Sequence, residues 1–168
     1  MKSGQVRPVR PDWLTVIRRY LVTATAGNFV WETAQMPLYT LWHTGTAREI
    51  TEAVLHCTLG DAAIASVALI AALALVGSPL WPDRRLGAMI VVVAVGSVGY
   101  TIYSEYVNTV LQRSWAYTAW MPRLPWLGTG LAPLGQWLII PPVALLWAGR
   151  ALPIRESSTE ERVAPCTK

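Results

Sequence analysis

Four long apolar stretches alternate with short polar or proline-containing segments along the chain. They cover about residues 20–42, 53–77, 86–107 and 130–148. A helix needs about 20 residues to cross the ~30 Å hydrocarbon core of a bilayer, and each stretch has roughly that length. The pattern therefore predicts an all-α fold in which residues 20–149 form a four-transmembrane-helix bundle.

Lysine and arginine lie mostly on one side of these predicted spans. Five belong to a basic arm (residues 1–19), two to the loop between the second and third spans, and four to a tail (residues 150–168), against three in the other two loops. Because basic residues accumulate in cytoplasmic segments, both the N and C termini are predicted to be cytoplasmic. Seven of the nine tryptophans fall near predicted span ends, which favours the same topology. The polar tail is expected to be disordered.

Composition excludes the main alternatives to a membrane protein. The chain is 53% hydrophobic and 14% charged, with a mean hydropathy of +0.36, whereas soluble domains average about 25% charged residues. The net charge of +4 comes from arginines that flank apolar segments, so no nucleic-acid binding is predicted. Cys57 and Cys166 occur without a CxxC motif, which argues against a disulfide framework and against thiol relay chemistry.

The first apolar stretch carries a polar face. Its polar residues follow one another at intervals of four, three and four residues, as Asn28, Glu32, Gln35 and Tyr39. On a helix these intervals keep all four within one arc. The other stretches also carry polar residues: His56, Cys57 and Asp61 in the second, Ser104, Glu105 and Asn108 in the third, and Gln136 in the fourth.

These polar positions are predicted to lie between the membrane centre and the outer interface. The cytoplasmic half, including residues 69–76 and 89–95, is almost entirely apolar. A charged side chain at mid-bilayer costs roughly 2.5–3.5 kcal/mol, so we expect the polar groups to share one pocket that opens to the periplasmic side. The predicted ligand-binding residues are Asn28, Glu32, Gln35, Tyr39, His56, Asp61, Glu105, Asn108 and Gln136.

Three functional hypotheses remain open on the sequence. The leading one is binding or transfer of a small polar or amphipathic ligand, such as a lipid. The second is a membrane-embedded acid–base enzyme acting on a lipid or isoprenoid head group, with Glu32, His56 and Asp61 as candidate catalytic residues. The third is a structural or assembly subunit, whose polar residues only join helices and whose partner is another membrane protein or a second copy. Metal-ligand motifs such as HExxH are missing, so no metal site is predicted, and the sequence identifies no cofactor.

Two helix boundaries have local signals. Residues 46–49 read Thr-Ala-Arg-Glu, which predicts a capping box at the start of the second helix. Pro37 is expected to kink the first helix near its outer end.

Two further expectations concern how side chains are directed. His56 and Asp61 are five residues apart, about 140° around a helix, so each is expected to face a different neighbouring helix. The loop from Arg113 to Arg123 contains Trp115, Tyr117 and Trp120. It is expected to lie on the membrane surface or, alternatively, to cover the pocket.

Several short sequence motifs resemble those of a group of membrane proteins. They are Trp31-Glu32 with Gln35 and Pro37-Leu38-Tyr39, Cys57-Thr58 with Gly60-Asp61, Ser104-Glu105 with Asn108, and Gly130-Leu131 with Gln136-Trp137. Together they resemble a group of small bacterial inner-membrane proteins with four helices, over about residues 28–147. The resemblance implies that the protein is located in the bacterial inner membrane and that these residues belong to one recurring design. It implies no activity, substrate or cofactor.

Overall fold

The computed structural model describes residues 12–82 and 84–150, and this part of the chain is helical. The predicted all-α fold is thus confirmed for the described residues, which contain two isolated bridges but no strand. The elements are α1 (Trp13–Gln35), η1 (Met36–Leu38), α2 (Leu41–Thr44), α3 (Ala47–Val76), α4 (Leu86–Tyr106), η2 (Val107–Leu111) and α5 (Leu131–Ala148). Most of the predicted basic arm and nearly all of the predicted tail, residues 1–11 and 151–168, lie outside the described residues.

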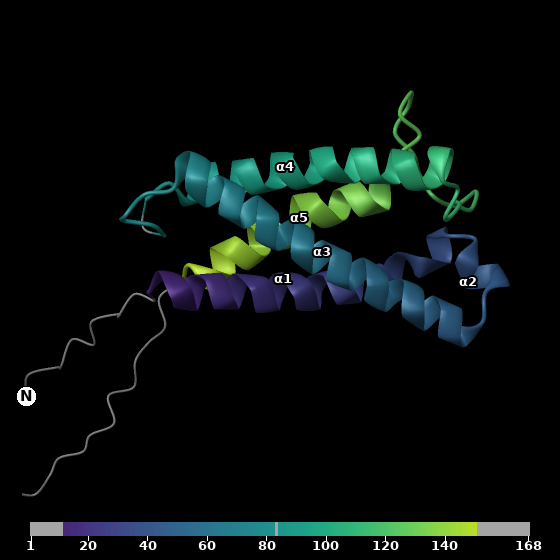
Figure 1. Ribbon diagram of the computed structural model, residues 1–168, viewed down its shortest axis with the longest axis horizontal. Coiled ribbons are helices and arrows are strands. Elements are labelled where there is room, and N and C mark those ends of the chain that lie inside the picture. Colours follow the sequence, from purple (N-terminus) through teal and green to yellow (C-terminus); the bar gives the residue numbers. More distant parts are fainter. Residues whose placement is uncertain (1–11, 83, 151–168) are drawn as a thin grey trace, which may run out of the picture.

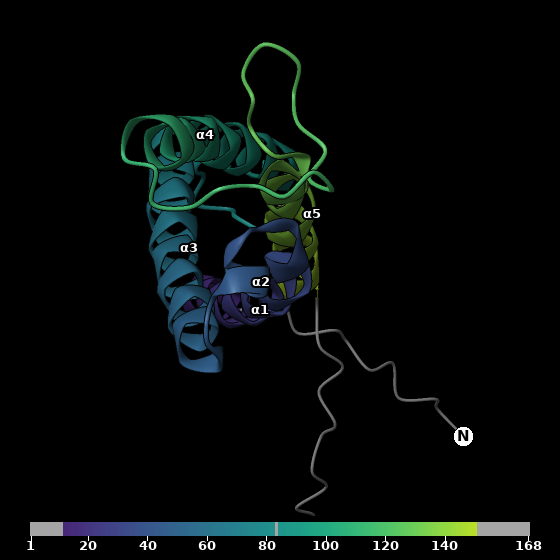
Figure 2. The ribbon, with the colours of Figure 1, turned by 90° about the vertical axis from the view of Figure 1, so that its right-hand side faces the viewer.

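The four long helices lie side by side along the long axis of the molecule (Figure 1). α1 contacts α3 and α5, and α4 contacts the same two helices from the other side. Seen along the long axis, the four helices surround a central space, with α2 across one end (Figure 2). The described chain begins and ends at the opposite end, where the Arg19 guanidinium donates to the carbonyl oxygen of Arg150 over 3.3 Å.

Within residues 12–82 and 84–150, three helices are long and apolar enough to cross a membrane: Ala47–Val76, Leu86–Leu111 and Leu131–Ala148. Their outward side chains are large and apolar, as lipid-facing side chains are. Leu59 is 71% exposed and Leu75 74%. α1 is not one of the three, so the fourth span stays a prediction.

The first helix is shifted toward the N-terminus relative to the predicted span of residues 20–42. It begins at Trp13 because Asp12 caps it, its carboxylate accepting from the Thr15 amide over 2.7 Å. It ends at Gln35, where Pro37 occupies the 3-10 turn η1. Pro37 therefore lies just beyond the end of α1, and residues 13–19 of the predicted arm are helical.

The predicted capping box is confirmed at the start of α3. The Glu49 carboxylate accepts from the Thr46 amide over 2.8 Å, and the Thr46 hydroxyl accepts from the Glu49 amide over 3.3 Å. These contacts start α3 at Ala47, six residues before the predicted span. The predicted third and fourth spans, by contrast, match α4 and α5 to within one residue.

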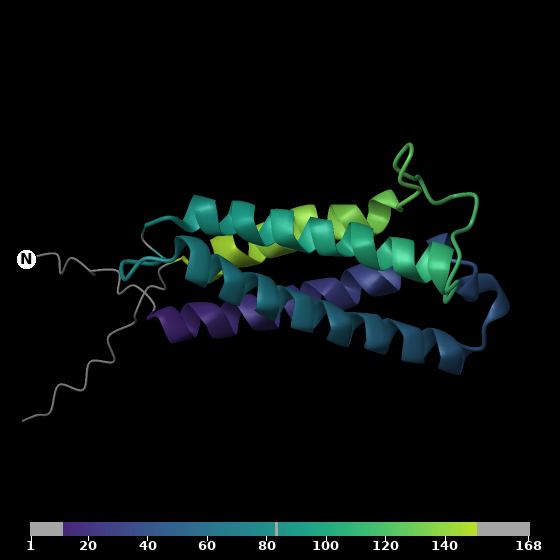
Figure 3. The same ribbon diagram turned by 45° about the horizontal axis from the view of Figure 1, so that its top comes forward.

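The helices pack closely at the end where the described chain begins and ends, which we call the closed half. Its buried side chains come from all four long helices and are Val16, Tyr20, Ala24, Leu69, Ala72, Met89, Val93, Leu145 and Ala148. All are at most 2% exposed. Toward the other end α3 and α4 separate (Figures 1 and 3).

Candidate functional site

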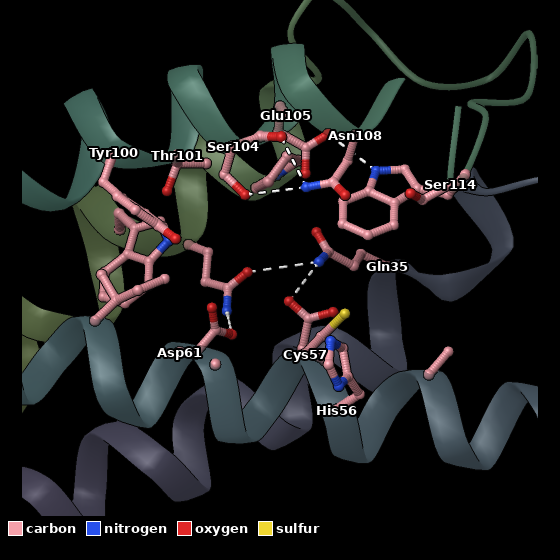
Figure 4. Close-up of a pocket in the computed structure, with 18 of the residues that line it drawn as sticks. Gln35, His56, Cys57, Asp61, Tyr100, Thr101, Ser104, Glu105, Asn108 and Ser114 are labelled. Carbon is pink, nitrogen blue, oxygen red and sulfur yellow. Dashed lines mark hydrogen bonds between the residues drawn. The ribbon is translucent and has the colours of Figure 1, made fainter. Parts of the chain in front are cut away.

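A cavity of about 1290 Å³ lies between the long helices in the half away from the chain ends (Figure 4). We call this half the open half. α1 and α5 supply buried lining residues, among them Glu32, Gln35 and Gln136. α3 and α4 supply the walls, and the outer end is lined by Tyr39, Thr40, Leu41, Thr44, Ser114 and Trp115.

The structure brings the residues expected from the sequence to this one place. Eight of the nine line the cavity: Glu32, Gln35, Tyr39, His56, Asp61, Glu105, Asn108 and Gln136. Asn28 lies beside the cavity. It is fully buried, and its side-chain oxygen accepts from Gln136 over 3.3 Å.

Gln136 on α5 joins the polar groups of the neighbouring helices. Its amide nitrogen donates to the Asp61 carboxylate over 2.7 Å and its oxygen accepts from Gln35 over 3.5 Å. Gln35 also donates to the Glu32 carboxylate over 2.8 Å. The carboxyl groups of Glu32 and Asp61 are thus linked through Gln35 and Gln136. One connected polar network therefore joins α1, α3 and α5 at the same depth.

Glu105 on α4 faces this network and is held by the loop that follows η2. Its carboxylate accepts from the Tyr117 hydroxyl and, over 3.4 Å, from the Trp115 indole. The Gly130 amide donates to the same Tyr117 hydroxyl over 3.1 Å. Burial and the hydrogen bond to Glu105 raise the pKa of the Tyr117 phenol above its ordinary value. Tyr117 thus connects the outer loop to α4 and to the start of α5.

The same loop crosses one end of the four-helix arrangement (Figure 2), and its residues Ser114 and Trp115 line the cavity there. Thr40 donates through its amide to the carbonyl of Ala116 over 2.9 Å, and Thr118 donates likewise to Leu38 over 2.9 Å. The Tyr39 and Tyr117 rings pack at 5.4 Å between centroids. This loop was expected either to lie on the membrane surface or to cover the pocket. Residues 114–118 lie over the outer end of the cavity. The sequence contains the aromatic residues but no signal for their pairing with residues 38–40.

Besides Thr44, Glu52 and Ser114, seven lining residues are exposed, and these seven belong to α3 or α4. They are His56, Gly60, Ala63, Val67 and Ala71 on α3, and Gly96 and Tyr100 on α4. The buried lining residues of α1 and α5 lie behind them, Glu32 being 7% exposed and Gln136 1%. The cavity therefore has a lateral opening between α3 and α4, in addition to the outer end at which the sequence placed it. In the sequence, the small side chains at positions 60, 63 and 96 were the feature that could have indicated this lateral opening.

His56 and Asp61 were expected to face different neighbouring helices, and the structure shows such a contact for Asp61 only. Asp61 is buried and bonded to α5, whereas His56 is exposed at the lateral opening. Among the hydrogen bonds of the described side chains, none joins His56 to Glu32 or Asp61. This geometry argues against the hypothesis that Glu32 and His56 act together as proton carriers.

The cavity is acidic. Glu32, Asp61 and Glu105 come from three different helices, and Glu52 stands at the rim in a salt bridge with Arg48. Among the described residues, no lysine or arginine lines the cavity. In the same part of the chain, no group of three or more His, Cys, Asp or Glu side chains is arranged to hold a metal ion.

Neither a family model, nor a curated protein, nor a solved structure matches this chain. The candidate function is therefore inferred from the side chains of the cavity.

Proposed function

We propose that this chain is a bacterial inner-membrane protein that crosses the bilayer four times, with both termini in the cytoplasm. α1 supplies the fourth span: its 23 residues extend about 35 Å at 1.5 Å per residue. Its outward residues include Val22 and Val30, which are 69% and 66% exposed, as expected against acyl chains. The clustering of arginines around the closed half supports the orientation.

We propose further that the cavity binds a small polar or amphipathic ligand within the outer half of the membrane, for transfer or within a larger complex. One observation carries the proposal: carboxyl groups from three helices line a single cavity of about 1290 Å³. Ionisable groups in membrane segments are costly and mark binding or transport sites by default. A purely structural role would be served by direct pairing, which leaves no cavity.

A panel of three amphiphiles with the same ten-carbon chain tests this proposal: decylamine, decanol and decanoate. The readout is the thermal unfolding midpoint of the full chain in detergent, since a ligand that binds the folded state raises it saturably. We expect at least one member to raise the midpoint of the wild type. Glu32→Gln should change that response.

A matched pair of variants controls for non-specific partition into the micelle. Gly96 lines the cavity whereas Gly99 does not, and a Cβ atom added at either position meets nothing within 4 Å. Gly96→Trp should abolish the saturable shift, and Gly99→Trp should retain it. If no probe gives a shift that distinguishes these variants, the binding role is wrong.

One observation favours a second candidate function, acid–base catalysis on a lipid or isoprenoid head group. The carboxyl groups of Glu32 and Asp61, which Gln35 and Gln136 link, are suited to hold and pass a proton. This function predicts that deletion of the gene changes the lipid profile and that the wild type, but not Asp61→Asn, restores it. Under a structural or assembly role, the same substitution lowers only stability or abundance.

A further inference from the structure

The charge of the cavity is unbalanced. Glu32, Asp61 and Glu105 all line the same cavity, and among the described residues no lysine or arginine lines it. The exposed His56 is the one basic side chain in the lining that the structure describes. Neighbouring carboxyl groups repel each other strongly when both are ionised, and a positively charged occupant would offset this repulsion.

A second observation points to a hydrogen-bond donor in that occupant. Gln35 is 5% exposed, and its side-chain oxygen has no hydrogen-bond partner. Its amide nitrogen is already used by Glu32. In Figure 4, Gln35 lies between Asp61 and Cys57 on one side and Glu105 and Asn108 on the other. A buried acceptor without a partner costs free energy, and a donor placed in the cavity would remove this cost.

The lateral opening indicates the chemistry of the rest of the ligand. Its α3 side includes Gly60, Ala63, Val67 and Ala71, and its α4 side includes Gly96. Apart from His56 and Tyr100, the residues of this opening carry no polar side-chain atom, and they lie on the surface that faces acyl chains in the proposed orientation. An apolar chain can pass through this opening while a polar head group stays in the cavity.

Building on the proposed function, we propose that the ligand is a cationic amphiphile, with a protonated primary amine head group and one apolar chain. The ammonium would lie among Glu32, Asp61 and Glu105 and donate to the free oxygen of Gln35. A quaternary ammonium has no N–H group and leaves Gln35 without a partner. A phosphate-bearing head group brings an anion to a cavity that offers it no cation.

The ten-carbon panel tests this class directly, with decyltrimethylammonium as a fourth probe and dissociation constants taken from saturable thermal shifts at pH 7. A charge-assisted hydrogen bond is roughly twice as strong as a neutral one. We therefore expect decylamine to bind at least about tenfold more tightly than decanol, with decyltrimethylammonium between them and decanoate weakest. These comparisons use the wild type alone and do not depend on how well a variant folds.

Two isosteric variants locate the head group. Glu32→Gln and Glu105→Gln should each weaken decylamine binding about tenfold while leaving decanol binding unchanged. Glu49→Gln is the matched control, because Glu49 lies outside the cavity in the capping box of α3. It should leave all four dissociation constants unchanged.

The failures of the two proposals are distinguishable. Equal binding of decylamine and decanol, or tighter binding of decanoate, would overturn the cationic ligand while leaving an amphiphile-binding cavity in place. Tighter binding of decyltrimethylammonium than of decylamine would overturn the role of the Gln35 oxygen and hence the primary amine. If none of the four probes gives a shift that Gly96→Trp abolishes, the proposed function fails as well.

Discussion

The two halves of the molecule are built from the same four helices and differ in what these helices bury. In the closed half, α3 and α4 meet, and the interior contains side chains such as Leu69, Met89 and Leu145, each at most 2% exposed. In the open half the same helices separate (Figure 3) and enclose a cavity lined by carboxyl and amide groups. The closed half therefore fixes the helices relative to one another. The open half uses this fixed framework to position the carboxyl and amide groups of the cavity.

The difference has a thermodynamic consequence. Apolar side chains that fill their space stabilise through packing, and shortening one leaves a void. Polar groups around a cavity contribute little net stability, but each one that loses its partner is expensive. Substitutions in the closed half should thus change stability alone, whereas substitutions in the open half should change stability and binding separately.

The largest effect on stability is expected for Leu145→Ala in the closed half. Leu145 on α5 is fully buried, whereas its neighbour Leu146 is 50% exposed. Truncating a buried leucine typically costs about 2–5 kcal/mol, so Leu145→Ala should lower the unfolding free energy by that amount. The measurement is unfolding in a fixed detergent. Leu146→Ala, the matched control, should stay within about 0.5 kcal/mol of the wild type, and equal losses would show that the closed half is not tightly packed.

An intermediate effect is expected for Gln136→Leu in the open half. The substitution removes the donor to Asp61 and the donor to Asn28. Leaving a buried acceptor without its partner costs about 1–3 kcal/mol. Combining it with Asp61→Leu should recover part of this loss, because both partners are then apolar. A double variant as unstable as the sum of the two single variants would contradict the contact between these residues.

The smallest effect is expected for Tyr117→Phe in the covering loop. The variant loses the hydroxyl that joins Glu105 to Gly130, which should cost about 1 kcal/mol and speed hydrogen exchange of the loop amides around residues 114–130.

The same contact has a defined pH dependence. The folded-state pKa of Tyr117 is raised above its ordinary value of 10.0, so its contribution to stability is complete below pH 10.0 and is lost as the pH rises further. Hydrogen exchange at pH 9 and pH 11 should therefore show loop release in the wild type and a weaker dependence in Tyr117→Phe. An identical response in both proteins would exclude this contact as the cause.

Much of the helical framework follows from the sequence because its causes are local. The 4-3-4 spacing from Asn28 to Tyr39 places those residues on one face, and the Thr46–Glu49 capping box starts α3 where the pattern predicts. The N-terminal limit of α1 was missed: the predicted span began at residue 20, whereas Asp12, a typical capping residue, starts the helix at Trp13.

The shape of the cavity could not be predicted in the same way. The lateral opening depends on the divergence of α3 from α4, which is set by contacts between residues far apart in the sequence. The bond from Tyr117 to Glu105 and the pairing of residues 114–118 with 38–40 are likewise non-local. Periodicity gives the face of a helix, but it does not give the distance to the next helix.

The most direct test of the difference between the two halves is the accessibility of two thiols on α3. Cys57 lines the cavity, whereas Ala72 is fully buried in the closed half. The test uses a membrane-impermeant maleimide added from the extracytoplasmic side, in a Cys166→Ser background and normalised to labelling after unfolding. Cys57 should be labelled in the folded protein, and the thiol of an Ala72→Cys, Cys57→Ser variant should react only after unfolding. Equal labelling of the two positions, or a Cys57 that reacts only after unfolding, would contradict an open polar half above a closed apolar one.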